Sequence, residues 1–427
     1  MSRGPSAFWH PFTPAEAPPP LEVARASGAY LELGDGRRLL DAISSWWVTL
    51  HGHAQPEIAA AIAGQAARLE QVIAAGFTHE PAEALAARLA ESLPLEGARV
   101  FYSDNGSTAV EVALKMALQF WGNQGAEGRR RFIAFEGAYH GDTVGAMSLG
   151  ARSLFTAAFE HVLFEVERVP FPATWPGDAG VEARETAALE RLEALLEADP
   201  AGYAAMVLEP LVQGAGGMRL CRPSFLRRVE QILRHYNVLA VYDEVMTGFG
   251  RTGELFACIK AGTRPDIVCL AKGLSGGFVP LAATVCSGRV QAAFAGGAER
   301  VFYHGHSYTA NPIGCAAGLA SWDLLQAGGG RYRRIEEWHR AEIDALQEHP
   351  RLERMRCCGT LAALDIKGGG AYGGPVSARL GRAFIARGIL LRPLGATVYI
   401  LPPYCIERDE LAAVYRAIAE EAAALET

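Results

Sequence analysis

The chain has 427 residues, half of them hydrophobic and a fifth charged, with a net charge of -7 and a pI near 5.9. This length exceeds one small core, so we expect a large domain and a smaller one. The negative charge argues against nucleic acid or an anionic membrane as the main partner. No apolar run reaches the length of a membrane span, and the first ten residues lack the apolar stretch of a secretion signal, so we expect a cytoplasmic protein. The eight cysteines include no Cys-x-x-Cys pair, so we expect neither a metal site nor a disulfide framework.

The first hundred residues indicate short elements. Residues 28–40 predict a hairpin that turns at a Gly-Asp-Gly sequence. Trp46 and Trp47 are adjacent and cannot point the same way on a strand, so we expect one in the core and the other lining a cavity. Alanine-rich segments at 56–73 and 81–92 have the spacing of helices.

Strands alternate with helices between residues 98 and 290, which is typical of a mostly parallel sheet covered on both faces. The expected strands cover residues 99–103, 131–135, 204–209, 238–244, 266–271 and 281–286, and the expected helices cover 109–121, 183–198 and 223–235. After residue 310 a mixture of elements indicates a smaller α+β domain. Helices are expected at 314–325, 331–347, 377–387 and 408–425, and strands at 361–366, 389–391 and 397–401.

Five chemically useful side chains fall just past the ends of expected strands: Ser107, Tyr139, Glu209, Asp243 and Lys272. Ligands of such sheets bind at the carboxyl ends of the strands. We therefore expect these five residues to meet at one edge and to form a site.

Lys272 follows an apolar strand at the start of a glycine-rich loop. Burying a lysine costs free energy, but a desolvated amine loses its proton easily and can attack a carbonyl group. The alternative is a side chain that extends from the strand end into water.

The turn at residues 104–108 lies between a strand and the start of a helix. Free backbone N–H groups and the helix dipole favour a phosphate there. The alternative is that Ser107 or Thr108 only caps the helix. Tyr139 lies between glycines in a loop, where it can stack on a flat ligand.

An amine, an anion site, a stacking aromatic and a buried acid together match the needs of pyridoxal 5'-phosphate (PLP). Asp243 ends a buried strand and can pair with the pyridine nitrogen, whereas Asp266 opens its strand at the opposite edge of the sheet. A nicotinamide or nucleotide site is not indicated. The glycines at 214–217 and 273–277 do not form Gly-x-Gly-x-x-Gly between a strand and a helix, and no Walker lysine pattern occurs.

Longer motifs resemble a known family over nearly the whole chain. The segments YDEVMTGFGRTG at 242–253 and YHGHSYTANP at 303–312, with Lys272 between them, resemble the class III (ω-) aminotransferases of PLP fold type I. Further segments resemble the branch of this family that aminates 8-amino-7-oxononanoate in biotin synthesis. These segments are residues 9–13, 44–47, 104–119 and 391–395.

The resemblance implies PLP as cofactor, small-molecule substrates and a homodimer with shared active sites. It also implies a large PLP-binding domain over residues 55–320 and a small domain formed by both chain ends, residues 1–54 and 321–427. In this comparison Lys272 binds the cofactor and later moves a proton, Asp243 holds the pyridine nitrogen, and Tyr139 stacks on the ring. The residues implied to hold the phosphate are Gly106 and Ser107 of one subunit with His306 and Ser307 of the other.

The resemblance also assigns residues to the substrate. Arg392 is implied to bind the carboxylate of the keto substrate, a use that suits its planar fork of N–H donors. Glu209 and Arg251 are expected near the ring as a pair. The residues implied to touch the substrate are Phe12, Trp46, Tyr139, Lys272, Gly305 and Arg392.

Two positions bear on the amino donor. Phe12 stands where many members have tyrosine, and His306-Ser307 stands where Pro-Thr is common. Both features resemble members that use lysine as donor. Trp46-Trp47 resembles the users of S-adenosylmethionine, which is the donor we expect, with lysine as the alternative.

Two other functions are alternatives to this one. A class III aminotransferase for another ω-amine, such as a diamine or a β-amino acid, would share most of these motifs, although the tryptophan pair and Arg392 weigh against it. A protein that keeps the PLP fold only for binding or regulation would be favoured by loss of the lysine or the aspartate. Both residues are present.

Overall fold

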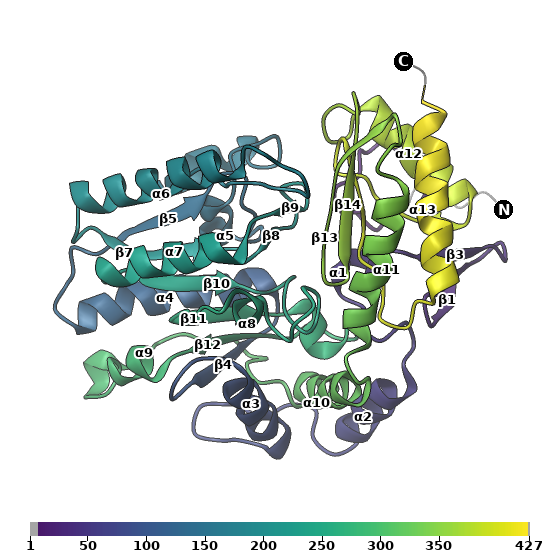
Figure 1. The fold of residues 1–427 in the computed structure, drawn as a ribbon. Helices are drawn as coiled ribbons and strands as arrows, with labels where there is room; N and C mark the ends of the chain where they lie inside the picture. The colour runs from purple at the N-terminus through teal and green to yellow at the C-terminus, as the bar shows by residue number, and fades with distance from the viewer. Residues whose placement is uncertain (1–6, 426–427) are drawn as a thin grey trace.

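The computed structural model describes residues 7–425 and centres on a seven-stranded sheet (Figure 1). The strands lie in the order β4 (Arg99–Ser103), β12 (Ala282–Cys286), β11 (Ile267–Leu270), β10 (Leu239–Asp243), β7 (Tyr203–Leu208), β5 (Arg131–Phe135) and β6 (Glu167–Val169). Every neighbouring pair is parallel except the two that β12 makes, which are antiparallel. The predicted mostly parallel α/β sheet is therefore confirmed, and all six predicted strands are present.

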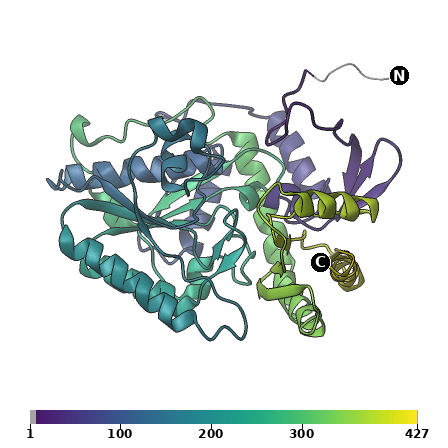
Figure 2. The same cartoon turned by 90° about the horizontal axis from the view of Figure 1, so that it is seen from above.

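Helices cover both faces of this sheet, as Figures 1 and 2 show. One face packs against α4 (Gly106–Asn123) and α5 (Val144–Leu149), and the other against α6 (Val181–Ala198) and α7 (Pro223–His235). Strands β7, β10 and β11 are buried along their whole length. Burial on both faces explains why these strands read as continuous apolar runs in the sequence.

Three helices lie along the bottom of the molecule in Figure 1, where α10 (Pro312–Ala327) packs against α2 (Pro56–Ala66) and α3 (Glu80–Ser92). The prediction that α2 continues to residue 73 is wrong. The side chain of Gln65 donates to the carbonyl of Leu69, and Asn311 donates to the carbonyl of Glu70 and to the side chain of Gln71. These contacts hold the segment after Ala66 in a non-helical path.

The two ends of the chain meet in a second group of sheets. Strands β1 (Val23–Ser27), β2 (Tyr30–Leu33), β3 (Arg38–Asp41) and β15 (Ile389–Leu390) form one sheet, and β13 (Leu352–Cys358), β14 (Leu361–Ile366) and β16 (Thr397–Ile400) form another. Helices α11 (Arg331–Ala345), α12 (Pro375–Ala386) and α13 (Arg408–Ala423) accompany them. The predicted hairpin is confirmed as β2 and β3, and β3 pairs in parallel with β15. The residue bounds of the two domains stay a prediction.

The remaining elements are short. They are α1 (Ser44–Trp47), α8 (Ala257–Ala261), α9 (Gly288–Ala292), the hairpin of β8 (Val212–Gln213) with β9 (Arg219–Leu220), and 3-10 turns at Ala157–Val162, Lys272–Ser275 and Ala298–Arg300. Within residues 7–425, no helix is both long and apolar enough to cross a membrane.

Candidate active site

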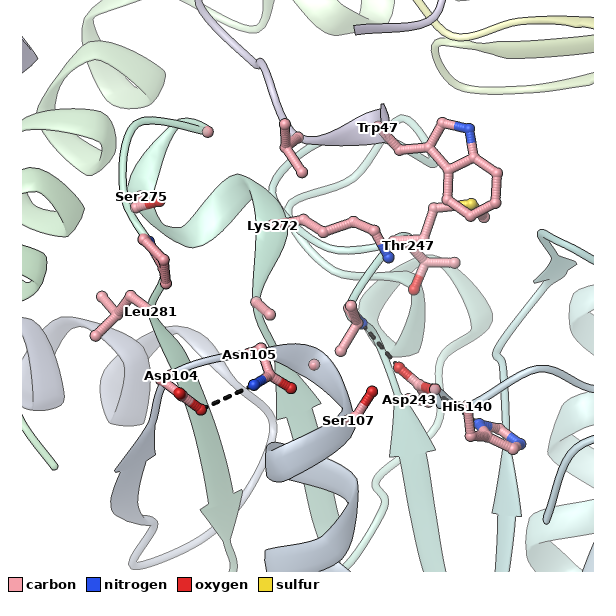
Figure 3. A pocket seen from close by; sticks show the side chains of 18 of the residues that line it. Trp47, Asp104, Asn105, Ser107, His140, Asp243, Thr247, Lys272, Ser275 and Leu281 are labelled. Atoms are coloured by element: carbon pink, nitrogen blue, oxygen red, sulfur yellow. Dashed lines mark hydrogen bonds and ion pairs between the residues drawn. The ribbon is translucent and has the colours of Figure 1, made fainter. Parts of the chain in front are cut away.

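A pocket of about 410 Å³ opens at the carboxyl ends of β10 and β11 (Figure 3). Ser107, Tyr139, Glu209, Asp243 and Lys272 all line it. The edge of the sheet thus brings together the five side chains that the strand pattern placed there. The pocket is of the size that a small coenzyme fills.

Lys272 begins the turn that follows β11, and its backbone has a φ of +45°, in the left-handed region that is costly for a residue with a side chain. Its Nζ lies 5.2 Å from the ring centroid of Trp47, toward which the side chain extends in Figure 3. Desolvation lowers the pKa of the Lys272 amine, while the nearby carboxylates of Asp243 and Glu209 act in the opposite direction. A lysine whose neutral form is favoured is suited to attack a carbonyl group.

Asp243 is only 6% exposed and is held by two neighbours. Nδ1 of His140 lies 2.8 Å from its Oδ2, and the N–H of Val245 donates to its Oδ1 at 3.1 Å. Nδ1 of His140 is the donor of this bond because a carboxylate only accepts. The carboxylate is thereby fixed at the floor of the pocket, where it can meet a protonated ring nitrogen.

Asp266 lies at the other end of β11, as expected. Its Oδ2 accepts from the N–H of Ala240 at 2.9 Å, and its Oδ1 pairs with Arg289 at 3.1 Å. These contacts hold the competing aspartate away from the pocket.

The start of α4 forms another side of the pocket. The side chain of Asn105 caps the helix by accepting from the N–H of Thr108 at 3.0 Å, and the Thr108 hydroxyl accepts from the N–H of Asn105. Ser107 is therefore not the cap. Its Oγ accepts instead from the N–H of Asp142 at 3.2 Å. The first N–H groups of a helix have no partner within it, so this end of α4 suits a phosphate.

Two glycines allow the backbone to close around this corner. A Cβ on Gly106 would lie 2.7 Å from Cγ1 of Val245, and one on Gly141 would lie 2.1 Å from Oγ of Ser107. Gly141 also has a φ of +129°. Neither position has room for a side chain unless its neighbour moves.

Gly141→Ala is expected to weaken PLP binding at least about tenfold, because the new methyl group displaces the Ser107 hydroxyl and one hydrogen bond to a charged group is worth about 1.5–3 kcal/mol. The measurement is the dissociation constant of PLP from the apoprotein. Gly122→Ala, in helix α4 with open space around the new atom, is the control. Equal affinities of the two variants would contradict this role of Gly141.

Glu209 connects the loop of Tyr139 to the pocket. Its Oε2 accepts from the N–H of Tyr139 at 3.1 Å, and its Oε1 accepts from the N–H of Gly214 at 2.8 Å. Burial raises the pKa of Glu209 to about 7, a shift that the nearby His140 opposes and Asp243 reinforces. Burial also raises the pKa of Tyr139, whose ring is 37% exposed at the pocket, so the phenol stays neutral.

Because the pKa of Glu209 is raised, the free energy of unfolding is expected to depend on pH. Between pH 4.5, its ordinary pKa, and about 7, the folded chain keeps the proton while the unfolded chain loses it. Stability therefore falls as the pH rises through this window, by roughly 3 kcal/mol for this group. Denaturant unfolding of wild type and Glu209→Gln across this range should show wild type losing stability relative to the variant. A difference between the two proteins that is constant with pH would refute the assignment.

Phe12, Trp46 and Arg392 lie together outside the residues that line the pocket. The guanidinium carbon of Arg392 is 5.0 Å from the Trp46 ring centroid, and the Phe12 and Trp46 rings are 5.4 Å apart, edge to face. Trp46 is 42% exposed, whereas Trp47 is 5% exposed and lines the pocket itself. The three predicted substrate residues thus form one cluster, next to the buried tryptophan.

The tryptophans are carried by a strained segment. Ser44, Ser45 and Trp47 have backbone φ values of 52°, 58° and 66°, which residues other than glycine rarely adopt. The buried carboxylate of Asp41 holds the segment, because it accepts from the N–H of Ser45 at 2.6 Å and contacts Nε2 of His53 at 2.8 Å. The hydroxyl of Ser44 donates to the carbonyl of Leu401 at 2.7 Å.

Gly305, His306 and Ser307 do not line the pocket of their own chain. The carbonyl of Ser307 accepts from Nε2 of Gln71 at 2.6 Å. Nε2 of His306 is 4.0 Å from Oδ1 of Asp104, a residue that does line the pocket. The expected role of His306 and Ser307 in a second subunit's site, and that of Gly305 beside the substrate, stay predictions.

The expected pair of Glu209 and Arg251 is wrong. Arg251 is buried and donates to the carbonyls of Pro402, Trp47 and Thr49, while Glu209 accepts from backbone N–H groups. Each side chain finds its hydrogen-bond partners on the backbone around it, apart from Nε of Arg251, which has none. Arg251 therefore joins the segment of the tryptophans to the C-terminal part of the chain.

Sequence reasoning missed three residues that shape the site: Asp41, Trp47 as a pocket wall, and His140 as the partner of Asp243. His140 follows Tyr139 directly, and a histidine in a loop that meets a buried aspartate was the available signal. For Asp41 the sequence holds no such signal, because its partners become neighbours only through the turn at residues 43–47.

The residues present fit PLP. One pocket holds an amine with a lowered pKa, a buried carboxylate, a neutral phenol and the start of a helix, whose first N–H groups have no partner within the helix. These are the groups that the aldehyde, the pyridine nitrogen, the ring face and the phosphate require.

Known proteins resemble the chain along its full length. The model of the aminotransferase class III family matches residues 12–421. The adenosylmethionine-8-amino-7-oxononanoate aminotransferase of Synechococcus elongatus is 54% identical over 97% of both chains, and that of Geobacter sulfurreducens is 39% identical over 95% of this chain and 93% of the other.

Solved structures agree in fold. The adenosylmethionine-8-amino-7-oxononanoate aminotransferase of Methanocaldococcus jannaschii superposes with a TM-score of 0.90 at 31% identity and covers 99% of this chain and 98% of its own. A PLP-bound amine transaminase from an uncultivated Pseudomonas species gives 0.89 at 30% identity, with 98% of each chain covered. The protein is thus an enzyme with the fold of the PLP-dependent transaminases, and it belongs to the class III aminotransferase family.

Proposed function

We propose that this enzyme uses PLP to convert 8-amino-7-oxononanoate to 7,8-diaminononanoate, a step of biotin biosynthesis, with S-adenosylmethionine as amino donor. When bound, PLP supplies an aldehyde that carries the amino group and a ring that withdraws electrons. The observation that supports the proposal most strongly is the shared pocket of Lys272 and Asp243, next to an apolar wall that ends at Arg392. Relatives up to 54% identical carry the name of this activity.

Each side chain of the pocket has its own role in this proposal. Lys272 holds the cofactor and, with its lowered pKa, takes and returns a proton at the reacting carbon of the substrate. Asp243 keeps a proton on the pyridine nitrogen, and Tyr139 covers the ring. The two substrates use the pocket in turn, so donor and acceptor never compete for room at the same step.

The acceptor has a long methylene chain between its ketone and its carboxylate. The rings of Phe12 and Trp46 give this chain an apolar wall, and Arg392 lies over the Trp46 ring to bind the carboxylate at the far end. Gly305 closely approaches the substrate in this proposal.

The enzyme is a homodimer with shared active sites in this proposal, and it works in the cytoplasm, where small biosynthetic substrates are available. Apolar surface supports the dimer. Trp9 and Leu154 are 91% and 86% exposed in the single chain, and Phe8 is 65% exposed. Such a dimer would bring His306 and Ser307 to the other subunit's phosphate. A measurement of the mass of the enzyme in solution tests whether it is a dimer.

The test of the function is to incubate the PLP-loaded enzyme with 8-amino-7-oxononanoate and one donor at a time. Formation of 7,8-diaminononanoate with S-adenosylmethionine is expected. Formation with lysine alone would keep the acceptor and replace the donor, and it would tie Phe12 and His306-Ser307 to that change. Failure with both donors, together with turnover of another amine, would leave only the broader aminotransferase activity.

A further inference from the structure

Four aromatic side chains form a linked cluster with Arg392, outside the residues that line the pocket. Nη2 of Arg392 donates to the hydroxyl of Tyr372 at 2.9 Å. The Tyr372 ring meets Phe155 edge to face at 5.1 Å, and Phe155 in turn meets Phe12 at 6.0 Å. Trp46 lies on the face of the Arg392 guanidinium, and the Tyr372 hydroxyl lies at its edge.

Tyr372 is carried by a glycine-rich segment, residues 368–374, which we call the strap. Gly368, Gly370 and Gly373 have φ values of +75°, +77° and +72°, so the strap follows a path that other residues rarely adopt. It packs closely on the turn after Arg392. A Cβ on Gly395 would lie 3.0 Å from both the carbonyl of Gly370 and the N–H of Tyr372.

We propose that Tyr372 is a positioning residue that aims Arg392 at the terminal carboxylate of the acceptor, so that the strap helps to select acceptors with a carboxylate at that end. The inference rests on the proposed function, since it concerns the same substrate. Tyr372 lies outside the motifs that carry the family resemblance.

The geometry explains how a phenol can do this. Arginine has five N–H donors in one plane and several rotatable bonds. Trp46 fixes the plane of the Arg392 guanidinium, and Tyr372 occupies one donor at its edge. The side chain is therefore ordered before the substrate arrives, and less freedom is lost when the carboxylate binds the remaining donors.

A role in core packing does not account for Tyr372. Its side chain is 38% exposed, and Gly370 and Gly373 on either side of it in the strap have open space around them. Its hydroxyl is directed to a substrate-binding residue of the proposed reaction. Removing the hydroxyl alone therefore tests positioning while the ring contact with Phe155 stays.

The first test compares wild type with Tyr372→Phe, at saturating donor, on 8-amino-7-oxononanoate and on its terminal carboxamide. We expect KM for the acid to rise about three- to tenfold, as for loss of one hydrogen bond, with kcat within about twofold. KM for the carboxamide should not change. The matched control is Tyr236→Phe, which should behave as wild type. Tyr236 follows the last residue of α7, and its hydroxyl contacts Glu197 of α6. An unchanged KM for the acid, or equal rises for acid and carboxamide, would overturn the proposal.

The second test does not depend on turnover. Calorimetry should show nonanoate, an unreactive carboxylate, binding the PLP-loaded Tyr372→Phe enzyme more weakly than wild type by a similar factor. In an Arg392→Ala background the same substitution should have no further effect, because the two residues act as one unit. Additive losses would overturn the proposal. If wild type fails to aminate 8-amino-7-oxononanoate, the proposed function fails, and nonanoate binding still decides the role of Tyr372.

Discussion

Replacing Lys272 with alanine is expected to abolish transamination, with turnover falling by at least roughly 10³-fold. The substitution removes the covalent attachment point for the cofactor and also the base that moves the proton, and proton transfer by a placed side chain alone contributes about 10²–10⁴-fold. Product formation at saturating donor and acceptor is the measurement. The visible absorbance of the bound cofactor should change as well.

The control for this prediction is Lys367→Ala, which removes an exposed lysine that donates to the carbonyl of Pro350. It should leave turnover at the wild-type level. If Lys272→Ala kept a rate comparable with wild type, another group would carry the chemistry and the central assignment would be wrong.

Asp243→Asn is expected to lower kcat by on the order of 10²–10³-fold, as when one oriented electrostatic partner of a transition state is lost. The amide has the shape of the carboxylate and can still contact His140, but it has no charge to keep the pyridine nitrogen protonated. The cofactor ring then withdraws electrons less well. The measurement is kcat of the PLP-saturated enzyme, so that weaker cofactor binding does not contribute.

Asp266→Asn is the matched control. Asp266 also lies at a strand end, but at the edge of the sheet opposite to Asp243, where it is paired with Arg289. Its kcat should stay within a few-fold of wild type. Similar losses in both variants would mean that the effect comes from the stability of the sheet and not from the pocket.

The sequence was a good guide wherever one local pattern decided the structure. Strands β7, β10 and β11 are buried on both faces, so each is a continuous apolar run, and the polar residue after each run marks the edge of the sheet. That regularity in the sequence predicts that Glu209, Asp243 and Lys272 share one pocket. The antiparallel direction of β12 was not predicted, because its pattern is the same in either direction.

The outer part of the site could not be predicted in the same way. The partners of Arg251 are backbone carbonyls of residues 47, 49 and 402, which no spacing in the sequence connects. The contact between Tyr372 and Arg392 likewise depends on how a glycine-rich segment folds back on a turn. Positive φ values at Ser44, Ser45 and Trp47 contradict local preference, and they persist only because Asp41 holds the segment.

The parallel pairing of β3 with β15 has a consequence for the order in which the protein is made. Residue 41 leaves the ribosome long before residue 389 is synthesised, and at about 5–20 residues per second the interval is roughly 20–70 s. During that time β3 has β2 on one side but lacks β15 on the other, and Ser44 lacks the carbonyl of Leu401. The strands of the central sheet, all between residues 99 and 286, have emerged well before then. The wall that Trp47 gives to the pocket is therefore completed only when translation is almost finished, so a prematurely terminated chain would carry Lys272 and Asp243 without a finished site.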